Sequence, residues 1–129
     1  MSGVRQGYRR YRRISKTKDI RGILSAGKRA RRGSLEVVWR EKSTSLRSAR
    51  AGVVITTRWR GSKPERNKLR RRYREALRKL IPEMRPGLEV LVNLKIQGRQ
   101  AEKAGKAGST LERLRGIMAR SGLLLERND

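Results

Sequence analysis

The sequence contains no cysteine, no histidine and no phenylalanine, and each absence narrows what the chain can do. Without cysteine there is no disulfide, no thiolate nucleophile and no cysteine-ligated zinc site. Without histidine, the commonest general base and metal ligand is also missing. The set of side chains available for catalysis or for holding a metal is therefore small, and we expect no metal site on the protein.

Negative charge is scarce as well. The 129 residues include 36 Lys and Arg against 11 Asp and Glu, which gives a net charge of +25. A net charge of about 2 to 8 is enough to keep a small domain soluble. A much larger excess destabilises a compact chain through self-repulsion unless a polyanion neutralises it. Nucleic acid is the expected polyanion, because each phosphate contact made by Lys or Arg releases a condensed counterion.

Long apolar runs and lipidation motifs are absent too, so we expect no membrane partner. The Arg-rich N-terminus has no apolar segment of the kind found in secretory signals, which predicts a cytoplasmic location. A mitochondrial transit peptide, partly imitated by residues 1–32, is the alternative. The length predicts one domain over residues 14–123, preceded by a basic flexible arm at 1–13 and followed by a tail at 124–129.

Hydrophobic periodicity predicts an α+β fold, a two-layer sandwich with the order α-β-β-α-β-α. A basic loop is expected at 28–33, and a polar hairpin at 42–50 is expected to pair the first two strands antiparallel. The last strand is apolar almost throughout, which favours the middle of the sheet. We expect the helices to share one face and leave a basic cleft on the other. The predicted helices cover residues 16–26, 62–81 and 110–121, and the predicted strands cover 35–40, 51–57 and 88–96.

The central helix carries the clearest local signals. Ser62 and Glu65 have the spacing of a capping box, with Pro64 in the first turn. A second capping box is predicted at Ser109 and Glu112. At 100° per residue the central helix has one apolar face and one cationic face. The apolar face comprises Leu69, Tyr73, Ala76, Leu77 and Leu80, and the cationic face comprises Asn67, Arg70, Arg71, Arg74 and Arg78. The alternative is a solvated helix face in which Glu75 pairs with the arginines.

The same helix carries a family resemblance. Its pattern Arg66-Asn67-x-x-Arg70-Arg71-x-x-Arg74-Glu75-x-x-Arg78 resembles the signature of the bacterial ribonuclease P protein component. The opening Arg13-Ile14-x-Lys16-x-x-Asp19-Ile20-x-x-Ile23-Leu24-x-x-Gly27-Lys28-Arg29 is similar to the N-terminal part of that family. Taken with the order of the later elements, the resemblance spans about residues 13–121.

The resemblance implies a left-handed βαβ crossover and an accessory subunit with no catalytic residues of its own. It implies that the subunit binds a catalytic RNA and the 5′ leader of precursor tRNA, one protein per RNA, while Mg²⁺ held mainly by the RNA supports cleavage. The implied RNA-binding residues are Arg66, Asn67, Lys68, Arg70, Arg71, Arg74, Arg78, Arg58, Arg60 and Lys63. The implied leader-cleft residues are Arg13, Lys16, Ile20, Leu24, Lys28 and Arg29.

The chain departs from the family pattern at Ile20 and Leu24, where phenylalanine is usual. Aliphatic side chains lack the π face on which bases stack, so these two residues are equally consistent with the core. Trp59, in the basic turn before the central helix, is expected in or beside the core, with nucleotide stacking as the alternative. A ribosomal protein that binds rRNA is the second functional hypothesis. A DNA-architectural protein is disfavoured, since no helix-turn-helix or zinc spacing is present.

Overall fold

The computed structural model describes residues 13–33, 35–42, 49–55, 62–94 and 107–125, and the structural statements below concern these residues. Three α-helices, a short 3-10 helix and four strands follow one another along the chain. Their bounds are α1 (Thr17–Ala26), β1 (Lys28–Arg32), β2 (Leu35–Glu41), β3 (Arg50–Ile55), α2 (Lys63–Leu80), η3 (Ile81–Glu83), β4 (Leu88–Leu94) and α4 (Ala107–Arg120).

The four strands form one mixed sheet in the order β1-β2-β4-β3. Strand β4 pairs antiparallel with β2 and parallel with β3. Every residue of β4 is buried, as a strand with neighbours on both edges and helices on both faces requires. The α+β class and the central place of the last strand are thereby confirmed.

Two local predictions about the sheet are wrong. Residues 28–32 form an edge strand, not a loop, and β1 turns back through Gly33, at φ 62°, to pair with β2. Strands β2 and β3 are not a hairpin pair, because β4 lies between them. Placing the apolar strand β4 between β2 and β3 buries both of its edges. This arrangement stabilises the sheet more than direct pairing of β2 with β3 would.

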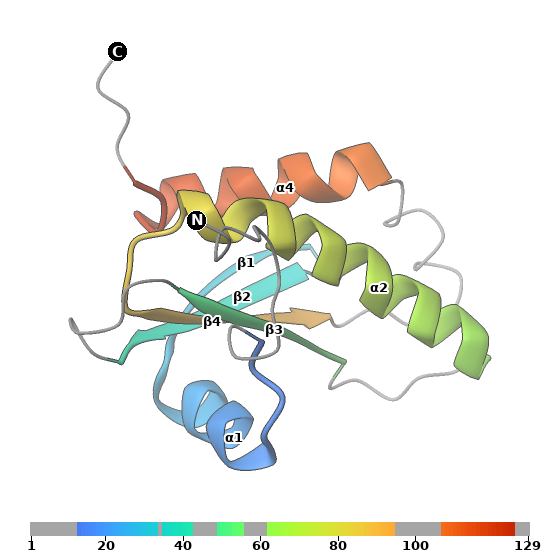
Figure 1. The fold of residues 1–129 in the computed structure, drawn as a ribbon, viewed down its shortest axis with the longest axis horizontal. Helices are drawn as coiled ribbons and strands as arrows, with labels where there is room; N and C mark the ends of the chain where they lie inside the picture. The colour runs from blue at the N-terminus through green and yellow to red at the C-terminus, as the bar shows by residue number, and fades with distance from the viewer. Residues whose placement is uncertain (1–12, 34, 43–48, 56–61, 95–106, 126–129) are drawn as a thin grey trace, which may run out of the picture.

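The connection from β3 through α2 to β4 joins two parallel strands. In Figure 1 both strands run from left to right, β3 lies in front of β4, and α2 crosses above them. This arrangement is left-handed, against the sense found in about 98% of such connections. The left-handed crossover implied by the family resemblance is therefore confirmed.

The helices lie on both faces of the sheet (Figure 1). The larger core lies under α2 and α4 and includes Tyr73, Leu77, Leu114 and Met118. A second, smaller core lies under α1, which contacts β2 and β4 from the opposite face. The expectation that all helices share one face therefore fails for α1, whose buried Ile23 has apolar partners on that side of the sheet.

The ends of α2 and α4 show which of the predicted caps form. Ser62 and Glu65 make the predicted capping box at the start of α2. By contrast, α4 begins at Ala107, so Ser109 lies within the helix and not at its N-cap position, where the second capping box was predicted. At the other end, Gly122 has φ 74° and Leu123 donates its N–H to the Met118 carbonyl at 2.9 Å, which closes the helix as a Schellman motif.

Backbone pairings are found on both sides of residues 14–123. Arg13 makes a parallel bridge with Ala51, which places it against β3. At the other end Leu124 bridges Met84, and the N–H of Leu125 donates to the Glu83 carbonyl at 2.7 Å. The rest of the predicted arm and tail, residues 1–12 and 126–129, lies outside the described residues.

Two glycines are predicted to respond in opposite ways to substitution by alanine. A Cβ on Gly27 would lie 2.6 Å from the Ile23 carbonyl oxygen and 2.8 Å from that of Trp39, whereas a Cβ on Gly116 would meet nothing within 4 Å. Gly27→Ala should therefore lower the free energy of unfolding by about 2 kcal/mol through overpacking. Gly116→Ala, inside α4, should raise it by about 0.5–1 kcal/mol. Urea unfolding of both variants would check this; equal effects would contradict the packing seen at Gly27.

Candidate nucleic-acid interface

The exposed side of α2 is divided by the helical period into two cationic flanks. One turns away from α4 and is called the outer flank below; the other faces α4. Arginines recur at every fourth position along the outer flank, so they form one ridge along the helix. The outer flank comprises Lys63, Arg66, Asn67, Arg70, Arg74 and Arg78, and the α4-facing flank comprises Lys68, Arg72 and Lys79, with Arg71 between the two.

The arginines of the outer flank have few partners within the protein. No salt bridge between described residues reaches Arg66, Arg70 or Arg74. The Nε atoms of Arg66 and Arg70 are buried and donate no hydrogen bond. Native proteins rarely leave buried donors unsatisfied. The positive charges of these arginines are therefore not neutralised by the described part of the protein.

The pKa of Arg70 is lowered from its ordinary value by burial first, and then by the positive charges of Arg66 and Arg74. Like charges on one helix ridge repel, and this repulsion disfavours their charged forms. An anion placed along the ridge would relieve this repulsion. The electrostatics of the outer flank therefore favour a polyanion.

The alternative of a solvated face paired with Glu75 applies to Arg78 alone. The Nε of Arg78 donates to the Glu75 carboxylate at 3.0 Å, and a second guanidinium nitrogen does the same. This contact lowers the pKa of Glu75 and raises that of Arg78. Among the predicted RNA-binding residues of α2, Arg78 is thus the least available cation.

Two further predicted RNA-binding residues, Lys63 and Lys68, lie on α2 beside the ridge of Arg66, Arg70 and Arg74. Lys63 is exposed at the first position of α2, and Lys68 lies on the α4-facing flank. Arg58 and Arg60, like Trp59 between them, lie outside the described residues.

The predicted leader-cleft residues gather on α1 and its neighbours. Ile20 and Leu24 are half-buried and pack against the small core of Ile23, Val38 and Leu91. Both residues therefore belong in part to the core. The residue types alone had left this question open. Lys16 and Lys28 are exposed at either end of α1, and Arg13 is half-buried beside β3.

Arg29 is held by the protein itself. It donates to the Glu36 carboxylate at 3.1 Å and to the carbonyl of Leu24 at the end of α1. Glu36 is nearly fully buried and also accepts from the Asn93 side chain at 2.9 Å. Arg29 therefore links α1 to the sheet, and its charge is already partly offset by a carboxylate.

A buried ionic cluster at the start of β4 was not predicted from the sequence. The fully buried carboxylate of Glu89 accepts from Arg40 at 2.8 Å and from Arg50 at 2.7 Å. Arg50 also lies 3.7 Å from Asp19 of α1. These contacts join α1, β2, β3 and β4, so the cluster stabilises the α1 side of the sheet.

The described residues contain no group of three or more acidic side chains that could together hold a metal ion. Most of their carboxylates are already engaged by arginine or by the helix cap at Ser62. None of the helices in the described part of the chain is both long enough and apolar enough to cross a membrane.

Comparisons of the sequence and of the structure with known proteins all lead to the same family. A family model described as Ribonuclease P matches residues 8–117. The ribonuclease P protein component of Picosynechococcus sp. is 27% identical over 90 residues, which cover 70% of this chain and 76% of that protein.

Solved structures of bacterial RNase P proteins share the fold. The RNase P protein of Staphylococcus aureus superposes with a TM-score of 0.69 at 18% identity, covering 88% of this chain and 98% of that one. The RNase P protein of Thermotoga maritima, in complex with a fluorophenyl thiourea, gives a TM-score of 0.67 at 23% identity, covering 83% and 97%. These likenesses show that the mixed sheet and its helices form the same fold in all three proteins.

Proposed function

The chain belongs to the ribonuclease P family, and from this premise we propose that it is the protein subunit of a bacterial ribonuclease P. In this proposal it binds the catalytic RNA through the outer flank of α2 and helps to hold the 5′ leader of precursor tRNA. It acts in the cytoplasm, with one protein per RNA. The RNA carries out the endonucleolytic cleavage that matures the 5′ end of the tRNA.

The observation that carries the proposal is the ridge of arginines on α2, which form no salt bridge with any other described residue. Three of them, Arg66, Arg70 and Arg74, lie about one turn apart along α2 and are partly exposed. Guanidinium groups bind phosphate oxygens through paired, charge-assisted hydrogen bonds. A ridge of such groups fits the backbone of a folded RNA, which proteins recognise mostly by shape and phosphate contacts.

Mg²⁺ would be held mainly by the RNA. A protein site for Mg²⁺ needs carboxylates free to reach the ion. In the described part of the chain these groups are committed elsewhere: Glu65 to a cap, Glu83 to Arg115 and Glu89 to two arginines. When bound to the RNA, the ion would supply electrostatic stabilisation and an activated water for cleavage. The contribution of the protein is binding and orientation.

The 5′ leader would pass along the α1 side of the molecule, near Arg13, Lys16 and Lys28. The aliphatic Ile20 and Leu24 offer less to a base than an aromatic ring, for which stacking contributes about 1–3 kcal/mol. We therefore propose that the leader is held chiefly through its backbone.

The division of labour predicts the outcome of a cleavage assay with precursor tRNA. Protein purified free of RNA should cleave nothing at any Mg²⁺ concentration, because it lacks the catalytic groups. Added to its ribonuclease P RNA, it should lower the Mg²⁺ concentration needed for half-maximal cleavage, since its cations take over part of the screening of RNA phosphates. Rapid Mg²⁺-dependent cleavage by RNA-free protein would contradict the proposal.

A further inference from the structure

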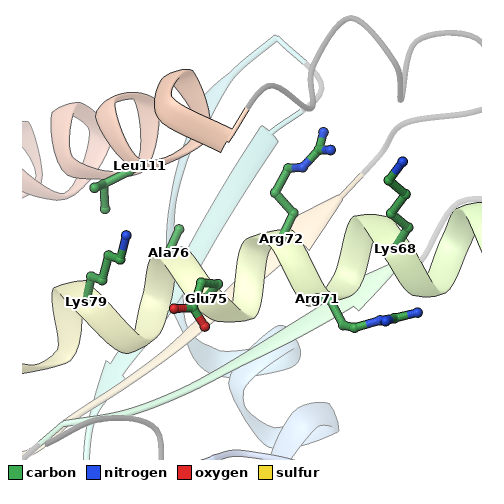
Figure 2. A pocket seen from close by; sticks show the side chains of 7 residues that line it. All are labelled: Lys68, Arg71, Arg72, Glu75, Ala76, Lys79 and Leu111. Atoms are coloured by element: carbon green, nitrogen blue, oxygen red, sulfur yellow. The ribbon is translucent and has the colours of Figure 1, made fainter.

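A groove runs between α2 and α4, on the opposite side of α2 from the outer flank (Figure 2). Its volume is about 510 Å³. Lys68, Arg72 and Lys79 project from α2 on the side that faces α4, while Arg71 projects from the other side of the helix. The apolar part of the lining comes from Ala76 and from Leu111 of α4.

The cations of this groove also lack partners within the described part of the protein. No salt bridge there reaches Lys68, Arg72 or Lys79. The one carboxylate of the lining, Glu75, is bound to Arg78. The groove therefore combines a concave shape with an unneutralised positive charge.

We propose that this groove binds the phosphate backbone of a second RNA segment, distinct from the segment held by the outer flank. The inference rests on the proposed function and extends it. Lys68 and Lys79 are eleven residues apart, or about 16 Å along the helix, so the row can follow several consecutive phosphates. Arg71, at the crest of α2, continues the positive surface from one flank to the other, so an RNA bound at the outer flank brings phosphates close to the groove.

The two flanks require separate RNA segments for a geometric reason. The ridge of Arg66, Arg70 and Arg74 and the row of Lys68 and Arg72 point to nearly opposite sides of α2. A helix with its side chains is about 10–12 Å across, so a single backbone would have to bend sharply around it to touch both rows. In the complex, α2 therefore lies between two parts of the folded RNA and fixes their spacing.

The absence of cysteine makes a directed cleavage experiment possible, because one introduced cysteine carries one probe. An iron–EDTA group would be attached at Lys79→Cys for the groove, at Asn67→Cys for the outer flank and at Arg32→Cys, on the edge strand β1, as the control. Each full-length protein would be bound to the ribonuclease P RNA and hydroxyl radicals generated. The groove and outer-flank probes should cut two separate RNA segments, and the control should cut neither.

If only the outer-flank probe cuts, the groove does not bind RNA, and the proposed function stands without it. If neither α2 probe cuts, the proposed function fails as well. The two failures are therefore distinguishable.

A second measurement, the salt dependence of RNA binding, tests whether the groove contacts RNA phosphates. The Arg72→Ala/Lys79→Ala double variant should bind the RNA with a log–log salt dependence shallower by about 1.8, or 0.9 for each of two lost phosphate contacts. The Arg32→Ala/Arg120→Ala variant removes the same charge elsewhere and should change the slope far less. Equal slopes in the two variants would overturn the proposal, because the groove would then make no RNA phosphate contacts. Urea unfolding would show that both variants fold.

Discussion

Replacing Arg66, Arg70 and Arg74 together with alanine is expected to weaken binding to ribonuclease P RNA by roughly a thousandfold. Each guanidinium is counted as one charge-assisted contact of about 1.5 kcal/mol, and 1.4 kcal/mol corresponds to a tenfold change. The log–log salt dependence of binding should become shallower by about 2.7, or 0.9 for each lost phosphate contact. Filter binding or fluorescence anisotropy across a series of salt concentrations would measure both effects.

The free energy of unfolding of the triple variant should stay the same or rise, although its RNA affinity falls. The three arginines repel one another and have no salt-bridge partners among the described residues, so their removal relieves strain in the free protein. Alanine also favours the helix. An unchanged or higher free energy of unfolding, together with a large loss of RNA affinity, is the signature of a ridge that serves binding.

The matched control removes three positive charges from exposed positions away from α2. These are Arg32, Lys42 and Arg120. Their replacement by alanine should weaken RNA binding only through the smaller net charge. If the control and the ridge variant lose the same affinity, the charge acts without regard to position, and the outer flank of α2 is not the RNA site.

Replacing Glu89 with glutamine is expected to lower the free energy of unfolding by about 3 kcal/mol, a large share of the 5–15 kcal/mol that holds a typical small domain together. The carboxylate is fully buried and accepts hydrogen bonds from both Arg40 and Arg50. Glutamine keeps the shape but removes the buried counter-charge that the two guanidinium groups share, and only Arg50 keeps a second carboxylate, Asp19, within 3.7 Å. Urea unfolding at fixed ionic strength would measure the loss.

Glu41→Gln is the control for this prediction. Glu41 also pairs with an arginine, Arg85, at 3.1 Å, but its side chain is 69% exposed. Exposed pairs of this kind contribute about 0–1 kcal/mol. Similar losses in the two variants would mean that the Glu89 cluster is accessible to water and does not stabilise the α1 side of the sheet.

Local periodicity was enough to predict α2 and β4. The apolar face of α2, from Leu69 to Leu80, is buried as predicted because its 3.6-residue period has only one way to meet the sheet. The nearly unbroken apolar run of β4 required a place between two strands. Of the ridge, Arg70 and Arg74 follow from the same period, whereas Arg66 was included only through the family resemblance.

Strand pairing and edge strands were harder to predict. The residues of β1 are almost all cationic, and only Ala30 among them is partly buried. This edge strand therefore lacks the alternation of apolar and polar residues by which a strand is predicted. Proximity in sequence favoured a β2–β3 hairpin, whereas the order of the sheet depends on β4, which comes after α2. A pattern confined to a few residues carries no information about such distant partners.

Contacts between distant segments limited the prediction of the sites as well. Glu89 lies 49 residues from Arg40 and 39 from Arg50, so the buried cluster had no local signal. Arg72 and Lys79 were not among the predicted RNA-binding residues, because their groove exists only once α4 packs beside α2. Both features depend on tertiary packing.

The identity of the bound RNA tests the central claim most directly. The full-length protein, tagged and expressed in its own host, would be purified at low salt and its RNA sequenced. The proposed function predicts one dominant RNA of a few hundred nucleotides, the catalytic subunit of ribonuclease P, and its loss from the Arg66, Arg70 and Arg74 variant. Ribosomal RNA as the dominant species would contradict the proposal and support the alternative of a ribosomal protein.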